Sequence, residues 1–209
     1  MKKVQQVGLA LAATATGLAM AMAPAAVADS ADAGVRSSAA AVGAGTPEPF
    51  AGQVRAAHLT PAQDRALRAE VAKYLQRSGG KQISLNEIKV DDRRTIRVAV
   101  PGEAHPRTFT DHGSTGPAYS SICNPWAVTR NGYFCAFSGE DFTGSEDPMY
   151  YCRSYPMNYT GTGSWVNRQY GTHVAKFYGK RGDYIDESLP PISLATSQNW
   201  YYVWTVVPC

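Results

Sequence analysis

The four cysteines of this chain all lie in its C-terminal half, and nearly all of its aromatic residues lie with them. The cysteines are Cys123, Cys135, Cys152 and Cys209. Only Phe50, Tyr74 and Phe109 precede Tyr119 among the aromatics. Cysteines gathered among closely spaced aromatics are typical of a small oxidised domain, in which disulfides supplement a limited core. This segregation predicts a disulfide-stapled module over residues 119–209.

The N-terminal segment has the three parts of a secretory signal peptide. Lys2-Lys3 forms a positive start, residues 7–23 are uncharged and rich in Ala and Leu, and Ala26-Val27-Ala28 is a small-x-small cleavage signal. The apolar run is short for a membrane span, and no basic stop-transfer cluster follows it. We therefore expect residues 1–28 to be removed, leaving a secreted, extracellular chain that starts at Asp29 without a membrane anchor.

Two segments read as linkers, and they flank a short folded unit. Residues 29–57 are mostly rich in Ala, Gly and Ser without periodicity, which predicts a flexible linker. Residues 103–118 carry Pro, Gly, His and Ser without an apolar pattern and read as a second linker. Between them, residues 58–102 predict a helix followed by two strands.

The helix of this unit has clear boundary signals. Thr60 can cap its N-terminus, Pro61 suits the first helical position, Gln63 completes a capping box, and Gly79-Gly80 ends it. The apolar side chains of one helical face are Leu67, Val71, Tyr74 and Leu75. Because a unit this small buries little surface alone, we hypothesise that residues 58–102 are a pro-segment or assembly aid, docked or removed after export.

Residues 119–209 predict an all-β module. Short aromatic runs alternate with Gly, Asn, Asp and Pro, and helical periodicity is absent. Asn131-Gly132 is a strong signal for a two-residue hairpin. Residues 200–207 read as a strand that would place Trp200 and Tyr202 on one face and Tyr201 on the other. Such spacing favours a small sandwich or barrel.

Four cysteines allow three pairings, of which Cys123–Cys135 with Cys152–Cys209 is the simplest. The first bond would close a short loop and the second a long one. A tight hairpin at Asn131-Gly132 would place Cys135 opposite Val128, so the chain would have to bend near Pro125 for this pairing. A redox or metal role is the alternative, but no Cys-x-x-Cys motif is present.

One stretch of the module resembles the opening of a βγ-crystallin Greek-key motif. The motif is an aromatic, four residues, a second aromatic, one residue and a glycine, and Phe137, Phe142 and Gly144 fill it. The resemblance places Ser164 as the later serine that caps the folded-over hairpin. It implies a βγ-crystallin-like Greek-key sandwich behind the helix-strand-strand unit, with a second motif loosely matched by Phe177, Gly182 and Tyr184 in the remainder of the chain.

Over residues 60–209 the chain resembles secreted actinobacterial peptidase inhibitors of the metalloproteinase-inhibitor type. The stretches that carry this resemblance are residues 74–80, 98–103, 132–135, 163–167, 171–172, 177–178 and 200–209. The resemblance implies a monomeric scaffold that binds a secreted peptidase. In the inhibitor that names the family, the protease-facing loop lies beside a cysteine pair in the second half. This chain has no cysteine between Cys152 and Cys209, so no reactive-loop residue is carried over.

Signals for other chemistry are weak. His173 is the single histidine of the module, and neither a Gly-x-Ser-x-Gly elbow nor a His-Glu-x-x-His helix accompanies it, so we expect no enzyme; a hydrolase using His173 and Ser164 is the least favoured alternative. The module is nearly neutral, which argues against nucleic acid. Its six basic residues are Arg130, Arg153, Arg168, Lys176, Lys180 and Arg181, and its seven acidic ones are Glu140, Asp141, Glu146, Asp147, Asp183, Asp186 and Glu187.

Calcium is the one cofactor that the acidic turns suggest. Glu140-Asp141 and Glu146-Asp147 flank Phe142 and could supply the oxygen ligands that Ca²⁺ requires. The ligand pattern of calcium-binding crystallin modules is absent from the module, so we read these residues as acidic turns in water and expect no metal site.

The favoured function is therefore inhibition of a secreted peptidase by loops of a rigid β scaffold. The longest polar turns are residues 140–148, which include Glu140 and Asp141, and residues 179–187. The alternative is a cell-wall or carbohydrate-binding module whose exposed aromatics, Tyr201 foremost, stack on sugar rings. Tyr and Trp suit either role because they bring large contact area at low entropy cost.

Overall fold

A computed structural model describes residues 48–209, so the predicted signal peptide and residues 29–47 of the expected linker lie outside the described residues. In the described remainder of that linker, Ala51–Ala56 forms helix α1, and helical structure therefore begins earlier than the composition suggested. No helix within residues 48–209 is both long and apolar enough to cross a bilayer.

Helix α2 (Pro61–Ser78) has the boundaries that the sequence predicts. The Thr60 hydroxyl accepts from the Gln63 N–H at 3.2 Å, and the Gln63 amide oxygen accepts from the Thr60 N–H at 3.0 Å. This reciprocal pair is the predicted capping box. The chain leaves the helix through Gly79, which has a φ of +68°.

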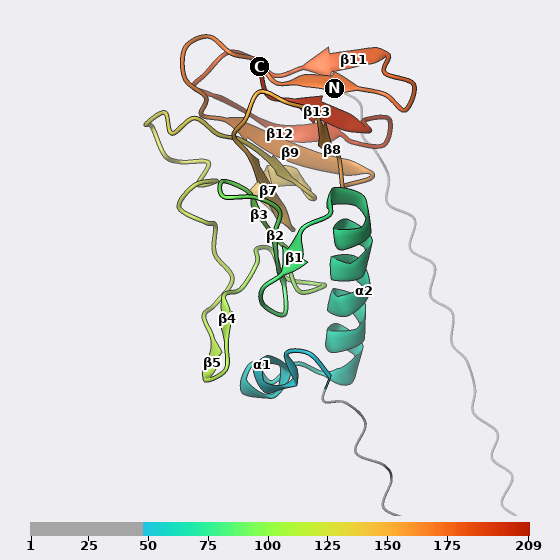
Figure 1. The fold of residues 1–209 in the computed structure, drawn as a ribbon. Helices are drawn as coiled ribbons and strands as arrows, with labels where there is room; N and C mark the ends of the chain where they lie inside the picture. Colours follow the sequence, from blue (N-terminus) through green and yellow to red (C-terminus); the bar gives the residue numbers. More distant parts are fainter. Residues whose placement is uncertain (1–47) are drawn as a thin grey trace, which may run out of the picture. The chain divides into compact units, whose positions relative to one another are not determined.

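An antiparallel sheet of seven strands runs through the described part of the chain (Figure 1). In spatial order the strands are β1 (Lys81–Gln82), β2 (Glu87–Lys89), β3 (Thr95–Arg97), β7 (Glu146–Met149), β6 (Phe134–Phe137), β9 (Thr162–Asn167) and β12 (Ser193–Asn199). Arg97 on β3 stands opposite Glu146 on β7. The strands of the expected helix-strand-strand unit thus extend the sheet of the aromatic module.

A second antiparallel sheet has four strands. In spatial order they are β11 (Tyr184–Glu187), β10 (Lys176–Tyr178), β13 (Thr205–Val207) and β8 (Tyr155–Pro156). The two halves of the module exchange strands between the sheets. Of the consecutive strands β6 to β9, only β8 lies in the second sheet. Of the strands β10 to β13, only β12 lies in the first sheet.

Residues 103–118, expected as a linker, fold back onto the protein. They contain the short hairpin of β4 (Phe109–Thr110) and β5 (Gly113–Ser114). Phe109 is buried in the main core. The Asn86 side chain donates to the Arg107 carbonyl at 2.9 Å, which ties the segment to the loop before β2.

The main hydrophobic core spans both sheets and α2. Helix α2 contributes Leu67, Val71 and Tyr74 to it, and the module contributes aromatics such as Phe134, Phe177 and Trp200. Continuous burial across these elements explains why so short a helix-strand-strand segment is ordered, because it shares its core with the module.

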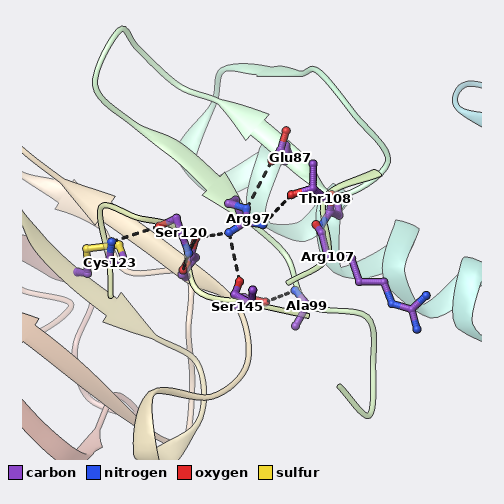
Figure 2. Close-up of polar contacts among 12 residues, drawn as sticks. Glu87, Arg97, Ala99, Arg107, Thr108, Ser120, Cys123 and Ser145 are labelled. Atoms are coloured by element: carbon purple, nitrogen blue, oxygen red, sulfur yellow. Dashed lines mark hydrogen bonds and ion pairs between the residues drawn. A yellow bond between two sulfur atoms is a disulfide. The ribbon is translucent and has the colours of Figure 1, made fainter. Parts of the chain in front are cut away.

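Two arginines of the N-terminal segment form ion pairs with β7. Arg94 makes two hydrogen bonds to Asp147, at 2.8 and 2.6 Å, and both side chains are buried. Arg97 contacts Glu146 at 2.8 Å and also reaches Glu87 and Thr108 (Figure 2). Charges removed from water are tolerated only when paired, so these contacts fix β3 against β7.

The same network reaches the first disulfide. The Ser120 N–H donates to the Glu146 carboxylate at 3.2 Å, and the Cys123 N–H donates to the Ser120 hydroxyl at 3.2 Å (Figure 2). The structure contains the disulfides Cys123–Cys135 and Cys152–Cys209, which is the pairing expected as the simplest of the three.

Two local predictions are wrong. Asn131-Gly132 does not form a β-hairpin, because the chain before β6 is an irregular loop and both N–H groups donate to the Arg168 carbonyl at 3.0 Å. Strand β13 starts only at Thr205, and the preceding residues form a turn in which the Val203 N–H donates to the Trp200 carbonyl at 3.0 Å. The expected alternation of faces from Trp200 onward is therefore lost.

Candidate functional site

The four residues of the expected crystallin motif meet at the hairpin between β6 and β7. The Ser164 hydroxyl accepts from the Phe142 N–H at 2.8 Å and donates to the Gly139 carbonyl at 2.6 Å. The rings of Phe137 and Phe142 pack edge to face, 5.8 Å apart. Gly144 has a φ of +80°, and an added Cβ would lie 2.1 Å from the Ser138 hydroxyl, so only glycine fits. These contacts hold the hairpin folded over the sheet.

The predicted partner-binding residues Glu140 and Asp141 lie on this folded hairpin and are exposed. The Glu140 carboxylate accepts from the Ser197 hydroxyl at 2.8 Å, and Asp141 has a φ of +51° within a short 3₁₀ turn, Glu140–Phe142. The hairpin therefore packs beside β12. Neither residue lines the cleft in which Tyr201 lies.

Glu146 and Asp147 do not form an acidic turn in water. Both are buried on β7, where Glu146 pairs with Arg97 and Asp147 pairs with Arg94. These two arginines lie some fifty residues earlier in the sequence. The polar turn predicted at residues 140–148 is therefore shorter, because residues 146–148 belong to β7. Within residues 48–209, no three His, Cys, Asp or Glu side chains gather as ligands for a metal ion.

The residues of the hydrolase alternative have separate environments. The Ser164 hydroxyl is buried and bonded to both sides of the folded hairpin. His173 is exposed on the loop after β9, where its carbonyl accepts from the Asn167 side chain at 3.0 Å. The Ser164 hydroxyl is thus engaged in holding the folded hairpin.

A loop that the sequence did not single out carries the two most exposed large apolar side chains of the described chain. Residues 124–130, here called the stapled loop, follow directly after Cys123. Trp126 on this loop is 69% exposed and Val128 is 80% exposed. The loop therefore presents two large apolar side chains to solvent.

The stapled loop is held at both ends. The Cys123–Cys135 disulfide anchors its start, and the buried Arg168 side chain donates to the Pro125 carbonyl at 2.6 Å. At its far end, the Asn131 side chain donates to the Ile122 carbonyl at 2.9 Å. Burial lowers the pKa of Arg168 from the usual value of arginine.

Internal contacts order the stapled loop further. The Trp126 N–H donates to the Asn124 side chain at 2.9 Å, which is an Asx turn. The Trp126 ring meets Phe142 edge to face at 6.0 Å, so the loop rests on the folded hairpin. The sequence signal that could have revealed it is Asn124-Pro125-Trp126 directly after a cysteine, which the competing hairpin signal at Asn131-Gly132 masked.

A second surface combines two sequence candidates. The turn between β10 and β11 covers residues 179–183, because residues 184–187 of the predicted polar turn form β11. This turn, Ile185 of β11 and residues 201–204 line a cleft of about 470 Å³, here called the aromatic cleft. Its lining consists of Thr160, Gly179, Lys180, Arg181, Asp183, Ile185, Tyr201, Tyr202 and Trp204. This volume lies within the range of ordinary ligand pockets.

The aromatics of the cleft are available to solvent. Tyr201 is 64% exposed and Tyr202 is 61% exposed, and their rings meet edge to face at 4.9 Å. Trp200, by contrast, is buried, and its indole N–H donates to the Phe137 carbonyl at 2.9 Å. The turn thus buries one aromatic and presents its neighbours, as the carbohydrate-binding alternative requires.

Comparisons with protein-family models, curated proteins and solved structures find no match to this chain.

Proposed function

We propose that this chain is a secreted binding protein that inhibits an extracellular peptidase through the stapled loop. The observation that carries the proposal is the combination of exposure and tethering in residues 124–130. Trp126 and Val128 project from a backbone fixed by a disulfide and by side-chain hydrogen bonds. Two disulfides also suit an extracellular location.

Pre-ordering is what this function needs. A loop that is rigid before contact loses little conformational entropy on binding, so more of its contact energy appears as affinity. A large aromatic such as Trp126 at the centre of a contact is the kind of side chain that dominates binding energy. The peptidase as target comes from the family resemblance.

We further propose that residues 119–209 form a βγ-crystallin-like double Greek key. The strand order supports this proposal. In each half, the fourth strand lies beside the first, as β9 does beside β6 and β13 beside β10, while the third strand joins the other sheet. The Ser164 contacts that hold the folded hairpin support it as well.

The inhibition proposal is tested by titrating secreted metallopeptidases and serine peptidases with the full mature chain. We expect stoichiometric inhibition of at least one enzyme, weakened roughly 30-fold by Trp126→Ala, since loss of a central anchor costs about 2 kcal/mol or more. Tyr202→Ala is the matched control, because it removes a similarly exposed aromatic outside the loop. Absence of inhibition in both enzyme classes, or equal effects of the two variants, would overturn the proposal.

A second function, carbohydrate binding, is favoured by the aromatic cleft. Tyr201 and Tyr202 present exposed rings beside the hydrogen-bonding side chains of Lys180 and Asp183. We expect the full chain to sediment with cell-wall polysaccharide and Tyr201→Ala to abolish this. Trp126→Ala should leave it unchanged, which separates the two surfaces. Equal retention of the parent and Tyr201→Ala proteins would remove the cleft from consideration.

A further inference from the structure

Basic side chains gather at the aromatic cleft. Lys180 and Arg181 line the cleft, and Asp183 is the one carboxylate in its lining. Within residues 48–209, Lys180, Arg181 and the neighbouring Arg77 form no ion pair. Other exposed cations among these residues, such as Arg65 and Lys89, are also unpaired, so what distinguishes the cleft is that two cations share its lining with a single carboxylate. The cleft therefore holds an excess of positive charge that the fold leaves unneutralised.

Trp204 holds two of these cations in place. The Arg77 guanidinium lies 4.6 Å from the centre of the Trp204 rings, and the Lys180 ammonium lies 4.9 Å from it. Cation–π contacts of this length restrain long side chains that would otherwise be mobile. The charge at the cleft is thus ordered before a ligand arrives, which reduces the entropy cost of using it.

The division of roles follows from these contacts. Trp204 is engaged by cations, so stacking against a ligand falls to Tyr201 and Tyr202. A sugar ring offers apolar C–H faces to such rings, and a carboxylate or phosphate on the sugar offers charge to Lys180 and Arg181. One ligand then satisfies both features of the cleft.

We infer that the aromatic cleft selects anionic glycans, meaning polysaccharides that bear carboxylate or phosphate groups. This inference rests on the proposed carbohydrate-binding function and adds the charge of the ligand. Nucleic acid is the competing anionic polymer, and the nearly neutral charge of the module disfavours it, because a phosphate backbone needs a tract of cations.

The test measures binding of the full mature chain to immobilised polygalacturonate, to a glycerol-phosphate polymer, to neutral cellulose and to single-stranded DNA. We expect at least about tenfold tighter binding to one anionic glycan than to cellulose, with affinity falling as salt is raised. Comparison of the carboxylate and phosphate polymers identifies the anion.

The double variant Lys180→Gln with Arg181→Gln should lose this preference while retaining any binding to cellulose. Its matched control is Arg65→Gln with Lys89→Gln, which removes the same charge from exposed positions outside the cleft. Equal binding of anionic and neutral glycans would overturn the charge inference but leave carbohydrate binding standing. Absence of binding to every glycan would overturn both the charge inference and carbohydrate binding. Tighter binding to DNA than to the glycans would show that the ligand is nucleic acid.

Discussion

Among single residues, Arg94 and Asp147 bear most directly on folding, because both charges are buried. Replacing Arg94 by Met leaves Asp147 with only the Asn158 amide, at 3.2 Å, as a donor among the side chains of residues 48–209. We expect Arg94→Met to lower the free energy of unfolding by about 3–5 kcal/mol, the usual cost of a broken buried pair. Urea denaturation measures this. The double variant Arg94→Met with Asp147→Leu should recover part of the loss, and a single variant within about 1 kcal/mol of the parent would contradict the argument.

Tyr159 offers a second prediction at this scale. Its ring meets Tyr74 at 5.6 Å, and its buried hydroxyl has no hydrogen-bond partner within residues 48–209. Burial raises the pKa of Tyr159 well above its ordinary value. In the unfolded chain the phenol ionises near pH 10, whereas in the folded protein it stays neutral, so stability is full below about pH 10 and falls as pH rises further.

Tyr159→Phe should therefore leave stability near pH 7 almost unchanged, because an unsatisfied hydroxyl is removed. Above pH 10 its stability should fall less steeply than that of the parent, by up to about 1.4 kcal/mol per pH unit. Denaturation series at neutral and alkaline pH measure both quantities, with Tyr202→Phe as the exposed control. Parallel alkaline slopes for the parent and Tyr159→Phe would show that the hydroxyl is not buried as described.

At the scale of elements, the stapled loop depends on its disulfide. Replacing Cys123 and Cys135 together by Ala should cost about 2–4 kcal/mol and release the loop from its anchor. We expect amide hydrogen exchange in residues 124–131 to accelerate at least about tenfold, while β10 and β11 remain unchanged. Uniform acceleration across the whole protein would indicate global destabilisation, and unchanged loop exchange would mean that the hydrogen bonds of Asn131 and Arg168 suffice.

Elements whose signals are local were predictable from the sequence. The boundaries of α2 follow from Thr60, Gln63 and Gly79 because capping acts within one helical turn. Asn131-Gly132 carries an equally strong local signal, but both of its N–H groups bond to Arg168, far along the chain. Tertiary contacts outweigh turn propensity there.

The candidate site shows the same limit. The polar turn after β10 was predictable, whereas the exposure of Tyr201 was argued from a strand alternation that is wrong. The meeting of the two in one cleft depends on the pairing of β10 with β13. Glu146 and Asp147 read as turn residues because charge dominates their local pattern. Their burial depends on arginines that β3 brings alongside β7.

At the scale of the whole molecule, the N-terminal segment is integrated with the module. It shares the seven-stranded sheet, the main core and the ion pairs to β7. Cutting an inserted protease site after the exposed Gly116 should therefore leave the two fragments associated on size exclusion. Denaturant should be needed to part them. Spontaneous release of the N-terminal fragment would favour the pro-segment hypothesis in its removable form.

The exchange of β8 and β12 between the sheets has a consequence for the stability of each half. A single half, cut from the other, would lack one strand of its own sheet and offer one strand without a sheet. Two identical halves could satisfy both needs only by trading strands, as domain-swapped dimers do. A chain that carries both halves meets these needs within one molecule, so each half should depend for its stability on the strand that the other half supplies.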